Sequence, residues 1–170
     1  MRIAIRGIDH VVQRVASLQN GLAGKVKELL QKLGEFGVDT EGARFETARY
    51  DGTNDVTVKA EWTDENTLTI HADGQAVAFI EFGTGVHFKE SHPKAAEFGA
   101  IRGTYGHGLG KLDMWRYRGD PGTHGEVYDD PHLPHFGMVA TYGNPPARAV
   151  FDTAKDLREK VAEIAQEVFT

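Results

Sequence analysis

The sequence predicts an α+β fold. A mainly antiparallel sheet is expected to pack against a long N-terminal helical region and a C-terminal helix. A long Gly/Pro-rich arm is expected in addition to these elements. Three observations predict this. Apolar residues recur at steps of three and four near both ends of the 170-residue chain, which is the spacing of one helical face. The middle of the chain alternates apolar and polar residues, as strands do. The segment after it contains all six prolines and twelve of the twenty glycines.

The N-terminal part is expected to form a short strand and then a long helical region. Residues 1–6 alternate apolar and polar side chains, which predicts the strand. The helical stripe that follows consists of Val11, Val15, Leu18, Leu22, Val26, Leu29, Leu33 and Phe36. Asn20, Gly21 and Gly24 interrupt this stripe, so we expect a kink or a junction between two helices there.

Three further strands are expected in succession. Residues 55–62 and 66–72 alternate with period two and are joined by a turn, which predicts a hairpin. Residues 75–82 predict a third strand, and all three are expected to share a mainly antiparallel sheet with residues 1–6. Trp62 falls on a strand and is expected in the core.

Residues 84–144, called the arm below, lack sustained periodicity. Only residues 137–143 predict a short strand within it, and the arm is expected to fold little on itself. A structureless segment of this length is usually functional or ordered by a partner, so we expect it to contact a neighbouring subunit. Its aromatic residues are expected to anchor that contact, because aromatic side chains are enriched in interfaces. They are Tyr105, Trp115, Tyr117 and Tyr128.

The chain closes with a predicted helix over residues 146–168. Its apolar residues again recur at helical spacing, and a proline suits the first turn of a helix. Asn144 is the expected N-cap. No second domain is indicated, so residues 1–170 are predicted to form one α+β domain with the arm as an insertion.

The composition excludes several classes of protein. The chain has no cysteine, which excludes disulfides and thiolate metal sites. Its net charge of −6 does not suit a protein that binds nucleic acid through a basic face. The N-terminus lacks the apolar core of a signal peptide, and no run approaches the roughly 20 apolar residues of a membrane span.

The histidines raise the possibility of a metal site. His87 and His92, with nearby glutamates, could supply ligands to zinc in a small metal-dependent hydrolase. Their spacing of five does not place both on one helical face, as the i, i+4 pair of a zinc protease does. The segment from Tyr105 to Lys111 lacks the spacing of a phosphate-binding loop. We therefore expect no catalytic residue, no metal and no cofactor, and expect both histidines to lie in a loop without convergent carboxylates.

Two segments resemble a known family. Glu81-Phe82-Gly83-Thr84 ends a predicted strand, and the segment from Pro146 to Phe151, which includes Arg148, opens the last helix. This order resembles the neck and tail-completion proteins of long-tailed bacteriophages, which act as tail terminators or in head–tail joining. Many members end a strand with Glu-Phe-Gly-Thr and open the last helix with a Pro-Ala-Arg-Pro-Phe-like segment. This chain has Ala149 where a proline is common. It also has residues 48–58 in place of a common Pro-x-x-Thr-Gly-x-Leu segment.

The resemblance implies a structural virion component without enzymatic activity. Such proteins form rings, often hexamers, between the head connector and the tail tube, and the genomic DNA passes through the lumen without sequence-specific binding. The residues singled out are then structural: Glu81 and Thr84 are expected to hydrogen-bond locally and so to fix the direction in which the arm leaves the core. The alternatives are the small hydrolase using loop histidines and a tail-tube subunit.

Overall fold

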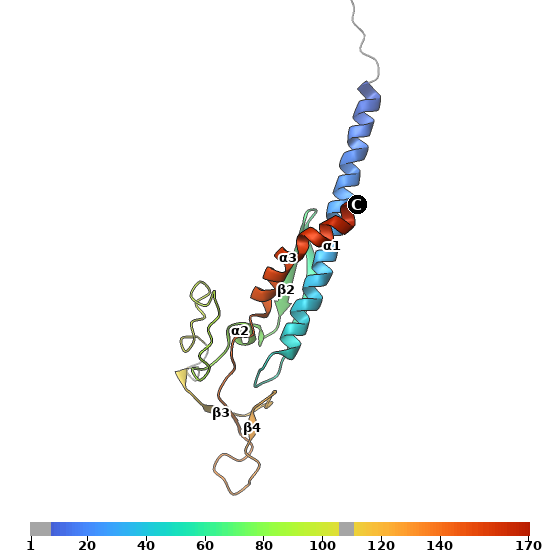
Figure 1. The fold of residues 1–170 in the computed structure, drawn as a ribbon. Helices are drawn as coiled ribbons and strands as arrows, with labels where there is room; N and C mark the ends of the chain where they lie inside the picture. Colours follow the sequence, from blue (N-terminus) through green and yellow to red (C-terminus); the bar gives the residue numbers. More distant parts are fainter. Residues whose placement is uncertain (1–7, 106–110) are drawn as a thin grey trace, which may run out of the picture.

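The computed structural model describes residues 8–105 and 111–170 and has the predicted α+β architecture (Figure 1). The strand predicted at residues 1–6 lies outside the described residues. The elements in chain order are α1 (Ile8–Thr47), β1 (Thr57–Asp64), β2 (Thr67–Asp73), α2 (Val77–Phe82), β3 (Trp115–Tyr117), β4 (Glu126–Val127), β5 (Val139–Thr141) and α3 (Ala149–Phe169). No helix among them is long and apolar enough to cross a membrane.

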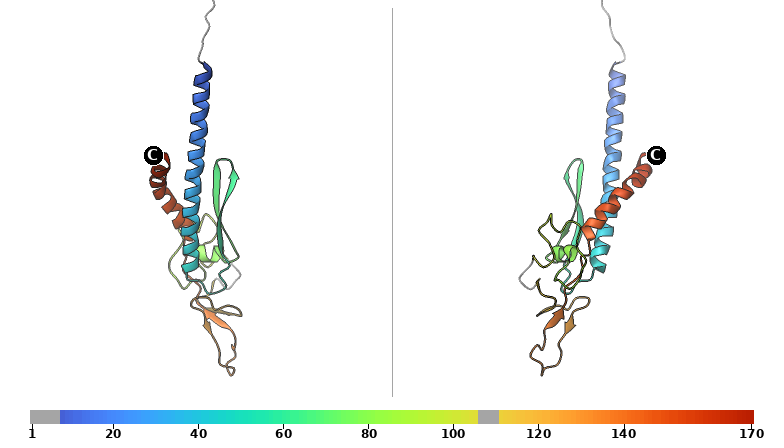
Figure 2. Two further views of the ribbon diagram at one scale, coloured as in Figure 1. Left: turned by 90° about the vertical axis from the view of Figure 1, so that its right-hand side faces the viewer. Right: turned by 60° about the vertical axis from the view of Figure 1, so that its left-hand side comes forward.

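The N-terminal helix α1 is one continuous helix of 40 residues, about 60 Å long at 1.5 Å per residue. The kink expected near Gly21 and Gly24 is wrong. Neither glycine has the positive φ of a helix break, so both remain helical at a cost of about 1 kcal/mol each relative to alanine. The C-terminal half of α1 packs against β1, β2 and α3. The N-terminal half extends beyond them (Figure 2).

The hairpin of β1 and β2 is confirmed. It pairs antiparallel from Thr57 opposite Asp73 to Trp62 opposite Leu68. Trp62 was expected in the core, which is wrong. Its side chain is exposed, and the ammonium group of Lys27 lies 5.3 Å from the centre of its ring.

The third strand predicted at residues 75–82 is wrong, because this segment forms the short helix α2. A helical turn brings Ala76 and Ile80 to the same face, where they are 2% and 0% exposed. The side chain of Asp55 accepts hydrogen bonds from the backbone N–H groups of Gln75 (2.8 Å) and Ala76 (2.9 Å) at the start of this turn. These bonds lower the pKa of Asp55, since they stabilise the charged carboxylate.

The arm forms a small sheet of its own, in the order β3-β5-β4 and antiparallel throughout. The short strand expected in residues 137–143 is confirmed as β5, whereas the expectation that the arm folds little on itself is wrong. The arm also bonds to the segment after α1. Thr123 N–H donates to the carbonyl of Tyr50 (3.0 Å), and the hydroxyl of Thr141 donates to Asp51 (2.6 Å).

The C-terminal helix is confirmed, but it begins at Ala149 rather than at residue 146. It packs along α1. Arg44 joins the two helices, because its guanidinium donates to the hydroxyl of Thr153 (2.8 Å) and pairs with Asp156 (2.7 Å). The buried apolar core lies where α1, α2 and α3 meet. It consists of Phe45, Ala48, Ala76, Ile80 and Ala149.

Replacing both Gly21 and Gly24 by alanine should raise the helix content of the chain. A methyl group at either position would meet no atom within 4 Å, and alanine favours an exposed helix interior by about 1 kcal/mol per site. Circular dichroism at 222 nm and slower amide exchange of residues 12–24 would report the change.

The matched control is Gly37→Ala in the packed half of the same helix. Its new methyl group would lie 2.2 Å from Cδ1 of Ile70 and 3.4 Å from Cδ1 of Leu157, so the same substitution should lower the thermal midpoint. Unchanged exchange in the Gly21/Gly24 variant would contradict a continuous helix.

Candidate functional site at the base of the arm

The two segments that carry the family resemblance lie side by side where the arm leaves the core and rejoins it. We call residues 80–84 and 144–151 the arm base. Ala147 N–H donates to the carbonyl of Ile80 (2.9 Å), Arg148 N–H to that of Glu81 (3.2 Å) and Thr84 N–H to that of Asn144 (2.9 Å). The exit and re-entry of the arm are therefore held together by backbone hydrogen bonds.

The motif Glu81-Phe82-Gly83-Thr84 ends a helix and not the predicted strand. Gly83 follows the last residue of α2 with φ of 77°, a conformation that favours glycine. A Cβ atom at this position would lie 2.7 Å from the nitrogen of Pro146 and 2.8 Å from the carbonyl oxygen of Asn144. The absence of a side chain at Gly83 thus permits the close approach of the two segments.

Thr84 and Asn144 lock this crossing through their side chains. The hydroxyl of Thr84 donates to the side-chain oxygen of Asn144 and accepts from its backbone N–H (3.1 Å). The amide nitrogen of Asn144 donates to the carbonyl of Phe79 (2.9 Å). Asn144 was expected to cap the last helix, which is wrong. It is 2% exposed and serves instead to bridge the two ends of the arm.

The cap of α3 is the carboxylate of Glu81. Its Oε2 accepts from Val150 N–H (2.9 Å) and its Oε1 from Phe151 N–H (3.0 Å), so it pairs with two of the N–H groups that a helix leaves free at its start. Arg148 precedes the helix with φ of 54° and makes no side-chain cap. The negative charge also lies at the positive end of the helix dipole. The expectation that Glu81 hydrogen-bonds locally is wrong, because Val150 and Phe151 lie about seventy positions away.

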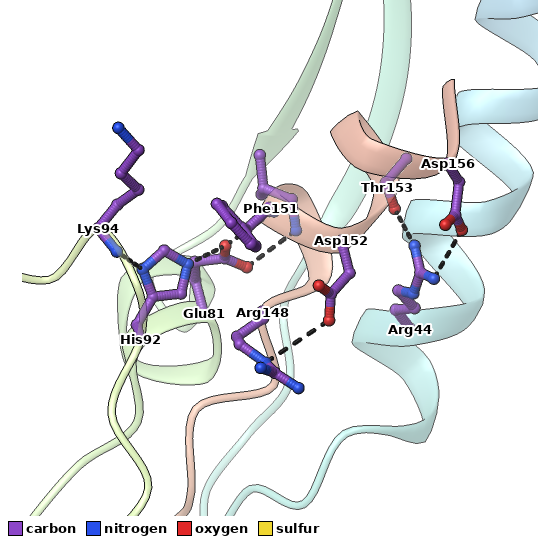
Figure 3. A network of polar contacts seen from close by, with 10 residues as sticks. Arg44, Glu81, His92, Lys94, Arg148, Phe151, Asp152, Thr153 and Asp156 are labelled. Atoms are coloured by element: carbon purple, nitrogen blue, oxygen red, sulfur yellow. Dashed lines mark hydrogen bonds and ion pairs between the residues drawn. The ribbon is translucent and has the colours of Figure 1, made fainter. Parts of the chain in front are cut away.

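A third segment also contacts the carboxylate of Glu81, because His92 at the beginning of the arm bonds to it (Figure 3). The backbone N–H of Lys94 donates to Nδ1 of His92 (3.0 Å), so Nδ1 carries no proton there. Nε2 then donates to Oε1 of Glu81 (3.0 Å). The rings of Phe82 and Phe151 meet the imidazole edge to face at 4.5 Å and 5.3 Å between centroids. Both imidazole nitrogens are thus committed to hydrogen bonds within the chain.

Each of the two loop histidines has one carboxylate neighbour. His92 contacts Glu81, and Nδ1 of His87 lies 3.1 Å from Asp113. The two carboxylates are different, so the histidines do not share a partner. Within residues 8–105 and 111–170, no group of three or more histidine and acidic side chains is placed to hold a metal ion. The side chains of His92 and Glu81 are 2% and 6% exposed, so the pair is placed to hold segments together, with little access for a substrate.

A second buried carboxylate lies near Glu81. Glu41 on α1 is 4% exposed, and its Oε1 has no hydrogen-bond partner among the described residues. Burial raises the pKa of Glu41, and the negative charge of Glu81 raises it further. The carboxylate of Glu81 accepts three hydrogen bonds, whereas Oε1 of Glu41 accepts none among the described residues. The fold therefore accommodates the charge of Glu81 better than that of Glu41.

The predicted arm aromatics all have partners within the chain. Tyr105 stacks on Phe79 at 6.1 Å between ring centroids, and burial raises the pKa of its hydroxyl. The ring of Trp115 lies against the backbone of Gly85.

The other two predicted aromatics lie within the sheet of the arm or beside it. The hydroxyl of Tyr117 donates to the carbonyl of Asp120 (2.5 Å). Burial, followed by the charges of Asp51 and Asp120, raises the pKa of Tyr117 to about 12. The guanidinium of Arg116 stacks on the ring of Tyr128 at 5.3 Å. All four aromatics are half-buried, and their contact with a neighbouring subunit stays a prediction.

The structure exposes a different apolar set on the arm. Phe98, Ile101, Leu112, Val127, Leu133, Phe136 and Tyr142 are 43% to 65% exposed. Phe98 borders an apolar pocket of about 370 Å³ at the arm base, which Val77, Phe82 and Phe151 also line. Sequence reasoning missed these residues because no periodicity marks a surface in an irregular segment. The only available signal was the presence of large apolar residues in a stretch rich in glycine and proline.

Comparison of the chain with protein-family models, curated proteins and solved structures finds no match. The resemblance to phage neck and tail-completion proteins therefore rests on the two motifs and their order.

Replacing Glu81 by glutamine should lower the free energy of unfolding by about 2 kcal/mol, because the charged acceptor of three hydrogen bonds is lost. The amide offers one acceptor oxygen, and its NH₂ group must then face at least one of the N–H donors. Urea unfolding measures the change. The control is Glu159→Gln, an exposed position on α3, where the change should stay within about 0.5 kcal/mol. Equal effects at the two positions would refute the capping role of Glu81.

Replacing Glu41 by glutamine should stabilise the fold at neutral pH but not at low pH. A raised pKa in the folded state means that the fold resists ionisation of Glu41, so the native protein is penalised progressively as the pH rises above the ordinary pKa of glutamate. Glutamine removes this penalty. The difference in unfolding midpoint between variant and parent should therefore grow with rising pH and vanish in acid. Glu46→Gln, exposed on the same helix, should show no such trend. A pH-independent difference would contradict the raised pKa.

Proposed function

We propose that the chain is a structural subunit of a ring at the head–tail junction of a long-tailed bacteriophage. In this role it completes the tail or joins it to the head connector, and DNA passes through the opening. It then resides in the virion at the neck or tail after assembly in the host cytoplasm, and it uses no cofactor and performs no catalysis. Its partners are copies of itself, most simply six, together with connector and tail-tube proteins.

One observation carries the proposal. The two motifs that resemble the family, Glu81-Phe82-Gly83-Thr84 and Pro146 to Phe151, are more than sixty residues apart in the sequence but form one hydrogen-bonded unit. Gly83 provides the close approach, and Glu81 caps the helix that the second motif opens. Both motifs then have one structural role, which is to hold the projecting arm in a fixed direction. Such a role suits a subunit whose arm contacts neighbouring subunits.

The shape of the subunit supports the same role. The free half of α1 and the sheet of the arm project from opposite ends of the core (Figures 1 and 2). Both carry exposed large apolar side chains, such as Leu18 at 72% on α1 and Val127 at 51% on β4. Large exposed apolar surfaces on a soluble domain usually mark contacts with other proteins. Two such surfaces at opposite ends suit a subunit with neighbours on more than one side.

The alternative of a metal-dependent hydrolase finds less support in the described geometry. His92 has both nitrogens engaged within the chain, and His87 contacts a different carboxylate. A catalytic zinc site requires three protein ligands that converge, and residues 8–105 and 111–170 offer no such group.

Native mass spectrometry and negative-stain electron microscopy of the purified chain, measured over a range of concentrations, test the proposal. Closed rings of one fixed subunit number are expected, most simply hexamers. Rings closed by symmetry have a defined mass at every concentration above assembly, whereas open assemblies grow with concentration. Open tubes would favour the tail-tube alternative. A chain that stays monomeric at all concentrations, and that hydrolyses esters only with added zinc, would overturn the proposal in favour of the hydrolase.

A further inference from the structure

The N-terminal half of α1 presents an apolar face with no partner in the described chain. Val12, Val15, Leu18 and Leu22, which we call the apolar stripe, are 59%, 49%, 72% and 56% exposed. They lie at helical steps of three and four, so they share one face. From Val12 to Gly24 the sequence has a single charged residue, Arg14. A helix that faces water on all sides usually carries more charge than this.

The apolar stripe continues a face that is already an interface further along the same helix. A step of four residues leads from Leu22 to Val26, and steps of three and four lead on to Leu29 and Leu33. These three later residues are partly buried, in the half of α1 that packs against the hairpin and α3. The stripe therefore extends an established packing surface beyond the elements that cover it.

A matching apolar groove lies on the core of the same chain. It has a volume of about 310 Å³ and lies between α1, β2 and α3. Its apolar walls, which define what we call the core groove, are Leu30, Leu33, Leu68, Ile70, Leu157 and Val161. Val161 is 39% exposed at its edge. Since α1 is one continuous helix that leads away from the core (Figure 2), its own stripe cannot fold back into this groove.

We propose that the apolar stripe of one copy docks in the core groove of a second copy. The contact would add a helix to the exposed groove between α1, β2 and α3, in the manner of an amphipathic helix laid in an apolar groove. It would cover the exposed side chains of both surfaces at once. The occupant is thus a neighbouring copy of this chain.

Pairing of two apolar stripes with each other accounts for the sequence less well. From Val12 to Leu22 the face spans less than two heptads, whereas stable coiled coils sustain three to four. Continued at heptad spacing from Val15, Leu18 and Leu22, the next three core positions of such a coil would be Lys25, Leu29 and Lys32, and two of these three are charged. Such a pair would also leave the core groove open.

The proposed contact joins two different surfaces, so it is heterologous. Each copy offers a stripe to one neighbour and a groove to another, and repetition closes a ring when the rotation permits. The inference therefore deepens the proposed ring and rests on it, because it names the surfaces through which successive subunits meet.

The absence of cysteine permits a direct test by disulfide formation in the full chain. Leu18→Cys places a thiol on the stripe, and Val161→Cys or, separately, Leu68→Cys places one in the groove. A stripe variant and a groove variant are mixed at assembling concentration, oxidised mildly and separated without reductant. A disulfide-linked dimer is expected in both mixtures and in neither variant alone.

The other outcomes overturn the inference in distinguishable ways. A dimer formed by Leu18→Cys alone would show stripe-to-stripe pairing instead. Closed rings in native mass spectrometry without a cross-link in either mixture would refute the stripe–groove contact and leave the ring proposal standing. Monomers at every concentration would refute both.

Substitution on the stripe provides a second measurement. The double variant Val15→Asp/Leu18→Asp should raise the concentration needed for assembly by roughly tenfold or more, because burial of a charged group replaces burial of apolar surface. Gln13→Asp/Ser17→Asp is the matched control, with the same added charge on the opposite face of the same helix segment. It should assemble like the parent chain. Equal effects of the two double variants would contradict the inference.

Discussion

The buried carboxylate of Glu81 is the interaction on which the rest of the arrangement depends. It accepts two N–H groups at the start of α3 and the imidazole of His92, and so joins the end of α2, the start of α3 and the beginning of the arm. An unpaired charge in this position would be costly, since transfer of a carboxylate out of water is strongly unfavourable. With three donors the charge is satisfied, but only when all three segments occupy their native places. The carboxylate therefore specifies one relative placement of the three segments.

The structure uses the same physical device at the start of α2. Asp55 accepts the N–H groups of Gln75 and Ala76, the two residues that precede α2, whereas Glu81 accepts two N–H groups in the first turn of α3. Neither helix is capped by a side chain of its own flanking residue. Capping by a distant carboxylate makes each helix start depend on a tertiary contact. Such a helix is stable only within the assembled core, because local propensity alone does not fix where it begins.

This dependence explains which parts of the fold could be predicted from the sequence. The hairpin of β1 and β2, the strand β5 and the long terminal helices follow from local periodicity, and the sequence predicts them. The α2 segment has apolar residues at both helical and alternating spacings, so the contacts of Asp55 and of Ala76 and Ile80 with the core decide between helix and strand. Trp62 lies at an apolar position of the alternating strand pattern. Only the tertiary structure shows that its side chain is exposed to water.

The candidate site was predictable only in part, for the same reason. The motif singled out Glu81 and Thr84. It could not predict their partners, because Phe151 and Asn144 lie sixty to seventy residues away in the sequence. Gly83 belongs to the same motif. In the structure it leaves room for the second segment to pass, which depends on a neighbour that no local pattern reveals. The pairing of β5 with β3 and β4 escaped prediction, because strands of two or three residues are too short to indicate their partners.

The two projecting ends of the molecule are connected through rigid elements. Glu81 fixes the start of α3 against the arm base, and Arg44 fixes α3 against α1 by an ion pair and a hydrogen bond. Nearer the end of α3, Nζ of Lys32 on α1 lies 3.3 Å from the carboxylate of Glu167. Nζ of Lys25 lies 5.7 Å from the centre of the Phe169 ring. The contacts between the helices thus extend to the point where α1 becomes free.

An exposed ion pair such as Lys32–Glu167 contributes little stability by itself, so the half-buried Arg44 contacts and the apolar packing hold the helices in register. A chain built in this way holds the base of its arm and its N-terminal helix against one another through packed helices. In the proposed ring such an orientation would matter, because a ring closes only when every subunit repeats the same rotation.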